Sequence, residues 1–189
     1  MQKKVLVLLA DGFEDVEAVT PIDYLRRAGI EVTTASISGS LTVTSRWGGI
    51  KITADAKLAE LLKLETNIPD AVILPGGMPG ASNLAASKET GLLLIKMAAA
   101  GKLICAICAS PAIVLAPLGL LSGRKFTCFP GMEEKVTDGV WSDSRTVTDG
   151  NIITSRAAGT AGEWSIAVIS ALLGETEGKK ITETILLIS

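Results

Sequence analysis

The segment Leu103–Pro111 constrains the fold of this chain more than any other stretch. Leu103 to Ile107 form a short unbroken apolar run, which is typical of a strand buried on both faces of a parallel sheet. Ser110 is a favourable N-cap and Pro111 a favourable first helical residue, so we expect a helix directly after the strand. The segment therefore predicts a strand–turn–helix unit with Cys108 at its corner.

Two interpretations of Cys108 are open at this point. A side chain on such a corner is exposed at the end of the sheet, as in a nucleophile elbow. The helix N-terminus beside it offers free N–H groups and a partial positive charge, and both favour a thiolate. Free cysteines are also among the most buried residue types, and most of them are inert. The segment alone favours neither a reactive nor a structural Cys108.

The remaining pattern alternates strands and helices in the order of a doubly wound α/β sandwich. All 189 residues are expected to form one domain, with helices on both faces of the sheet. Residues 41–55 depart from the pattern and predict a β-hairpin outside the main sheet. Thr160 and Glu163 have the spacing of a capping box before a helix. Strands are expected at 5–10, 30–37, 71–74, 125–128, 139–141, 145–148 and 152–154. Further helices are expected at four places: one begins near residue 14, one covers 88–100, one ends near residue 173 and one covers 179–187.

Three unusual features follow the carboxyl ends of the predicted strands, where sheets of this type bind ligands. Glu17 comes after the first strand, the Gly76-Gly77 turn after the third and Cys108 after the fourth. The N–H groups of such a turn can face an anion or an oxyanion, or the turn can simply need residues with positive φ. A protonated Glu17 beside Cys108 would stabilise a thiolate, so we expect the two groups to share one proton.

The composition excludes several kinds of site. There is no histidine, which excludes a Cys-His or Ser-His-Asp set and makes a zinc site improbable with three cysteines. In an extended strand Cys105 lies about 10 Å from Cys108, beyond disulfide reach, so Cys105 is expected to be a core residue. No glycine motif of a nucleotide site follows the first strand, so we expect no cofactor and no metal.

The charge and the N-terminal segment bear on partners and location. A net charge of −2, few aromatic residues and no basic run argue against nucleic acid and membrane partners. The apolar run Val5–Ala10 is too short for the core of a signal peptide. We therefore expect a cytoplasmic, reducing environment in which the thiols stay free.

Four motifs occur in an order and spacing that resemble one known family. They are Leu9–Glu17 (LADGFEDVE), Leu74–Gly77 (LPGG), Ala106–Ala109 (AICA) and Thr154–Arg156 (TSR). The chain resembles the ThiJ/PfpI family, in the branch of the Parkinson-disease protein deglycase, over essentially its whole length. The resemblance implies a flavodoxin-like three-layer sandwich, a mostly parallel central sheet and a homodimer.

The same resemblance implies roles for particular residues. Cys108 matches the reactive cysteine of the family, and Glu17 matches the protonated glutamate that bonds its sulfur. Gly77 and Ala109 match the backbone donors to an oxyanion. The remaining pocket positions that the resemblance indicates are Gly76, Arg46, Arg156 and Phe129.

The implied activity is cofactor-independent glyoxalase or deglycase chemistry on methylglyoxal-like carbonyls, in defence against carbonyl and oxidative stress. The alternative is a redox sensor or chaperone-like stress protein in which Cys108 is oxidised to sulfinate without turnover. Phe129 stands where the branch often has a pocket histidine, and losing a general acid or base typically costs about 10²–10⁴-fold in rate. Weak turnover is therefore expected, and the missing histidine argues against a protease or an amidotransferase.

Overall fold

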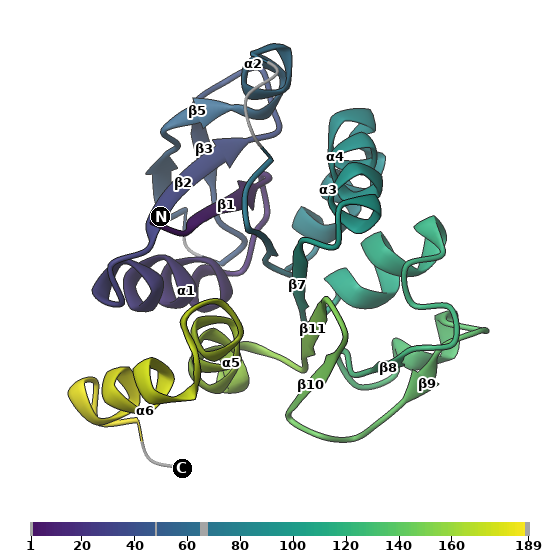
Figure 1. Cartoon of the computed structure of the whole chain (residues 1–189). Coiled ribbons are helices and arrows are strands. Elements are labelled where there is room, and N and C mark those ends of the chain that lie inside the picture. Colours follow the sequence, from purple (N-terminus) through teal and green to yellow (C-terminus); the bar gives the residue numbers. More distant parts are fainter. Residues whose placement is uncertain (1, 48, 65–67, 188–189) are drawn as a thin grey trace.

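A seven-stranded sheet forms the centre of the computed structural model, which describes residues 2–47, 49–64 and 68–187 (Figure 1). The strand order is β10-β11-β7-β6-β1-β2-β5, and every neighbouring pair is parallel except β10 with β11. The strands are β1 (Lys4–Leu9), β2 (Glu31–Ser36), β5 (Ala56–Lys57), β6 (Ala71–Leu74), β7 (Leu103–Ile107), β10 (Thr146–Asp149) and β11 (Ile152–Ser155). The chain runs outward from β1 to β5 and then returns to β6 on the other side of β1.

The residues of each strand point alternately into two separate apolar cores. In β1, Val5, Val7 and Leu9 enter one core, whereas Leu6 and Leu8 enter the other. The first core is covered by α1 (Asp15–Arg27), α5 (Ala161–Leu173) and α6 (Glu175–Thr184). The second is covered by α2 (Leu58–Lys63), α3 (Gly80–Ala86) and α4 (Lys88–Ala99). The prediction of a mostly parallel α/β sandwich is confirmed.

Two small sheets lie outside the main one. The predicted hairpin is present as β3 (Thr42–Thr44) paired antiparallel with β4 (Lys51–Thr53), and Gly48 in its loop lies outside the described residues. The expected strand at 125–128 is shorter: β8 (Lys125–Phe126) pairs in parallel with β9 (Val140–Trp141). Pairing stops after Phe126 because the Thr127 N–H donates to the side chain of Thr154 at 2.9 Å instead.

The helical ends differ from the sequence-based expectations in three places. The prediction of a capping box at Thr160 and Glu163 is wrong. The Thr160 side chain makes no cap bond to α5, and the Glu163 carboxylate accepts from Arg145 Nε at 2.8 and 2.9 Å. Helix α3 was not predicted, and α6 begins at Glu175 rather than near residue 179. None of the described helices is both long and apolar enough to cross a membrane.

Two leucines of α4 test the core assignment. Leu94 is fully buried in the second core, whereas Leu92 on the same helix is 60% exposed. We predict that Leu94→Ala lowers the free energy of unfolding by about 2–5 kcal/mol through lost burial and a residual cavity. Leu92→Ala is expected to cost less than about 1 kcal/mol. Urea unfolding of both variants measures the difference, and equal losses would contradict the packing of α4.

Candidate active site around Cys108

Cys108 lies at a strained corner directly after β7. Its φ is +62°, in the left-handed region that residues with a side chain rarely adopt. Two backbone bonds hold it there: the Cys108 N–H donates to the Ser155 carbonyl at 2.9 Å, and the Cys108 carbonyl accepts from the Phe129 N–H at 2.8 Å. Cys108 is partly exposed, whereas Cys105 and Cys128 are free and buried. Of the three free cysteines, Cys108 is thus the one that is not fully buried.

The helical segment after the corner begins differently from the prediction. Pro111 is the first residue of a short π-helix, Pro111–Leu115, as expected for its position. Ser110 is not a cap, because its backbone is already helical. Its hydroxyl instead donates to the Pro75 carbonyl at 2.6 Å. This bond ties the corner to the glycine turn after β6.

Glu17 is the buried acid beside the thiol. It lies on α1 with 1% of its surface exposed, and its Oε2 accepts from the Gly76 N–H at 2.8 Å. A Cβ at Gly76 would lie 2.6 Å from both Cys108 Cβ and Glu17 Oε2, so only glycine fits between them. Gly77, with φ +86°, is equally enclosed by the backbone around Gly12 and Phe13.

The surroundings raise the pKa of both groups. Burial raises the pKa of Glu17 to about 7, and the charge of Glu14 adds to the rise, while the Gly76 N–H and the Cys108 thiol oppose it. Burial also raises the pKa of Cys108 to about 12, and an ionised Glu17 adds to this. A thiolate near neutral pH therefore depends on Glu17 keeping its proton, since the surroundings of the sulfur by themselves favour the thiol.

Two backbone N–H groups oppose that rise at the sulfur. The N–H groups of Gly77 and Ala109 are within hydrogen-bonding reach of the Cys108 side chain and lower its pKa. They come from the glycine turn and from the corner itself. Negative charge on the sulfur, or on an oxygen bound next to it, would meet two fixed donors.

The other predicted pocket residues are less directly connected to Cys108 and Glu17. Phe129 is joined to the corner through its backbone and is 44% exposed. The exposed Arg46 guanidinium lies over the Trp47 ring, 4.2 Å from its centroid. Arg156 Nη1 donates to the Asp143 carbonyl at 2.9 Å, and its charge acts on Cys128. Within the described residues, neither arginine makes a hydrogen bond or ion pair with Cys108 or Glu17.

Some contacts at the site carry no sequence signal. The Ser155 carbonyl and the Phe129 N–H hold Cys108 through the backbone, so the side chains of these two residues do not reveal the role.

A cavity of about 970 Å³ lies at the opposite, amino ends of the strands. It is lined by Lys4, Asp70 and Lys102 among others, and it contains none of the predicted site residues. In the part of the chain that is described, no group of three or more His, Cys, Asp or Glu could hold a metal ion.

An α/β sandwich with a cysteine on a strand–helix corner and a buried glutamate beside it defines the class of this protein. Residues 3–171 match the model of the DJ-1/PfpI family, and the chain belongs to that family.

Individual relatives agree with this assignment. Protein DJ-1 homolog B of Arabidopsis thaliana is 41% identical over 183 residues, covering 97% of this chain and 41% of that protein. This chain thus spans about two fifths of the plant relative. A protein named as a deglycase from Pyrococcus abyssi is 34% identical over 163 residues, covering 85% of this chain and 94% of its own. The crystal structure of Drosophila melanogaster DJ-1beta, 36% identical, matches with a TM-score of 0.93 over 100% of both chains.

The raised pKa of Glu17 predicts how stability depends on pH. The folded protein holds this proton more tightly than the unfolded chain, so its contribution to stability is present below about pH 4.5 and is lost as the pH rises through about 7. Glu17→Gln removes the titration. We predict that between pH 5 and 8 the wild type loses on the order of 3 kcal/mol relative to this variant, measured by urea unfolding. Parallel pH curves for the two proteins would contradict the assignment.

Proposed function

We propose that this protein carries out cofactor-independent glyoxalase or deglycase chemistry on small reactive carbonyls, with Cys108 as nucleophile. The observation that carries the proposal is the buried Glu17 carboxyl held by the Gly76 N–H beside the partly exposed thiol. Membership of the DJ-1/PfpI family and the naming of a relative as a deglycase support it. The free thiols fit a reducing, cytoplasmic location.

The first step forms a bond between sulfur and the carbonyl carbon. The Cys108 thiol loses its proton to water while Glu17 retains its own; the thiolate then adds to the aldehyde carbon of methylglyoxal, and the carbonyl oxygen becomes an oxyanion. The N–H groups of Gly77 and Ala109 supply two donors for that oxygen. Transfer of the Glu17 proton to the oxyanion gives a neutral hemithioacetal.

The second step moves a proton between the two carbons of the adduct. Glu17, now ionised, takes the proton from C1 and returns it to C2, and the proton of the C1 hydroxyl passes to the oxygen on C2, which converts the hemithioacetal into a thioester. Water then cleaves the carbon–sulfur bond, so that methylglyoxal and water give lactate and the thiol is restored. A pKa of about 7 suits a group that must act alternately as acid and base near neutral pH.

Lactate formation from methylglyoxal tests this function. The wild type is expected to produce lactate slowly, because Phe129 offers no imidazole for proton transfer. Cys108→Ser is expected to lose all enzymic lactate, whereas Cys128→Ser, which removes a buried thiol, should retain it. The proposal fails if wild type and Cys108→Ser give equal lactate in an enzymatic assay that detects less than one turnover.

A redox-sensing role is the second candidate, and the unequal exposure of the three cysteines favours it. Peroxide can reach the partly exposed Cys108 more easily than the buried Cys105 and Cys128. Oxygens added to the Cys108 sulfur would meet the N–H groups of Gly77 and Ala109 and the proton of Glu17. These contacts would favour a sulfinate as the stable product.

Intact-protein and peptide mass spectra after graded peroxide test the sensing role. We predict that two oxygen atoms are added at Cys108 before either other cysteine changes. In Glu17→Gln, which cannot exchange a proton with the sulfur, the rate of this oxidation should fall by about tenfold. Oxidation spread evenly over the three cysteines would rule out selective sensing.

A homodimer is also proposed, as the family resemblance implies. Val16 and Val19 on α1 are 46% and 45% exposed, and Trp47 on the neighbouring hairpin is 69% exposed. Trp47 Nε1 donates to Glu14 at 3.1 Å, which places the hairpin against the start of α1. These exposed apolar side chains mark the surface that a second copy would cover.

A further inference from the structure

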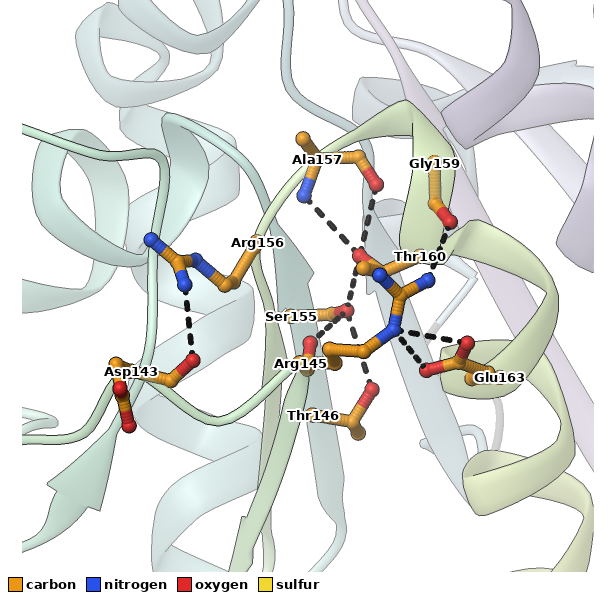
Figure 2. A network of polar contacts seen from close by, with 9 residues as sticks. All are labelled: Asp143, Arg145, Thr146, Ser155, Arg156, Ala157, Gly159, Thr160 and Glu163. Atoms are coloured by element: carbon orange, nitrogen blue, oxygen red, sulfur yellow. Dashed lines mark hydrogen bonds and ion pairs between the residues drawn. The ribbon is translucent and has the colours of Figure 1, made fainter. Parts of the chain in front are cut away.

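The hydroxyl of Thr160 lies at the centre of a polar network beyond the end of β11 (Figure 2). Its Oγ1 lies 2.7 Å from Ser155 Oγ, 2.8 Å from the Ala157 carbonyl oxygen and 3.1 Å from the Ala157 nitrogen, whose N–H it accepts. Thr160 is 5% exposed. A buried hydroxyl with three polar neighbours on two segments is placed to fix how those segments lie relative to each other.

One of these segments holds the backbone of Cys108. Ser155 is the last residue of β11, and its carbonyl accepts the Cys108 N–H at 2.9 Å. The Ser155 side chain is fully buried and lies between Thr160 and the Arg145 carbonyl, 2.7 Å from each. The Thr160 hydroxyl therefore reaches the strained corner through a single residue.

The other segment is the 3₁₀ turn Ala158–Thr160, which faces Glu17. The N–H of Ala158 acts on the Glu17 carboxyl more weakly than the Gly76 N–H and favours its charged form. Arg145 fastens the same turn from the surface, since its Nη2 donates to the Gly159 carbonyl at 2.8 Å and its Nε to Glu163. The turn is thus held on its inner side by Thr160 and on its outer side by Arg145.

We propose that Thr160 is a positioning residue for the Cys108–Glu17 pair. Its hydroxyl joins the end of β11, which holds the Cys108 backbone, to the turn 158–160, whose N–H faces the Glu17 carboxyl. Thr160 acts through these segments and touches neither reacting group. The assignment depends on the proposed function only in treating Cys108 and Glu17 as the reactive pair.

The groups around Glu17 fix the expected direction of change. Within the described residues, the charges and donors that act on its carboxyl are Glu14 from the same helix, the Cys108 side chain from the corner, the Gly76 N–H from the glycine turn and the Ala158 N–H. Loosening the turn 158–160 directly weakens the last of these. The carboxylate then loses one donor, so Glu17 should hold its proton to higher pH.

A direct titration of the Glu17 carboxyl tests the proposal on the full chain. Carboxyl carbons labelled with ¹³C at glutamate are followed by NMR from pH 4 to 9, and Glu17→Gln assigns the signal. Thr160→Val keeps the shape but removes the hydroxyl, and we expect the midpoint to rise by about 0.3–1 pH unit. Thr160→Ser keeps the hydroxyl and should stay within about 0.2 unit of the wild type.

Two further variants separate positioning from a general loss of stability. Ser165→Ala removes another fully buried hydroxyl from α5, one that donates to Ala161 at 2.7 Å, and should leave the midpoint unchanged. Arg145→Gln removes the outer contact of the same turn. Because the Arg145 side chain is 59% exposed, this variant is expected to fold even if Thr160→Val does not. It should shift the Glu17 midpoint in the same direction as Thr160→Val.

Two results would overturn the proposal. One is an unchanged Glu17 midpoint in Arg145→Gln and in any folded Thr160→Val. The other is an equal shift in Ser165→Ala. The titration requires no turnover, so absence of lactate would reject the glyoxalase activity while leaving this measurement decisive.

Discussion

Burial of the Glu17 carboxyl against the Cys108 thiol is the interaction on which the site depends. Helix α1 places Glu17 in the same face as Ala18 and Leu25, which pack into the first core, so the acid is removed from water. The Gly76 N–H bonds one of its oxygens, and the Ala158 N–H favours the charged form more weakly. These N–H groups do not replace the hydration that a carboxylate loses, and the acid therefore keeps its proton to a higher pH than usual.

The corner at Cys108 follows from the same packing. A left-handed conformation at a residue with a side chain costs about 1–3 kcal/mol and persists only where the surroundings hold it. The surroundings here are two backbone bonds, to Ser155 and Phe129, and the position of β7 between β6 and β11 in the main sheet. Because Gly76 has no side chain, the corner and the acid can approach each other directly.

The fold was predictable because its signals are local. Unbroken apolar runs identify β1, β6 and β7, and their alternation between two cores needs only the period of a strand. The meeting of Glu17, Gly76 and Cys108 could also be predicted, since parallel strands bring their carboxyl ends to one edge. The predictions that failed were those of the helix caps. Ser110 and Thr160 have the residue types and spacing of caps, but the Ser110 hydroxyl bonds the distant Pro75 carbonyl and the Thr160 hydroxyl bonds Ser155 and Ala157, which precede it.

The contacts that hold Cys108 could not be predicted from residue types, for a different reason. They are made by the carbonyl of Ser155 and the N–H of Phe129, groups that nearly every residue carries. The pKa of Glu17 was beyond sequence reasoning as well, because it depends on how completely the acid is buried. The sequence indicated that Glu17 and Cys108 would share a proton, and only the structure places the Gly76 N–H and the neighbouring Glu14 charge beside that carboxyl.

The absence of histidine separates the two candidate functions by the work that Glu17 must do. In the glyoxalase reaction Glu17 must give a proton to the oxyanion, take one from C1 and return it to C2. It must do all of this because Phe129 offers no second acid or base at the corner. Sulfinate formation needs only a thiolate, an oxidant and donors for the product oxygens. The pair would supply the thiolate and the N–H groups of Gly77 and Ala109 the donors, so that only the peroxide has to come from outside. Oxidation of Cys108 is therefore the less demanding use of this site, and carbonyl turnover is the use that tests how far one buried acid can serve as both acid and base.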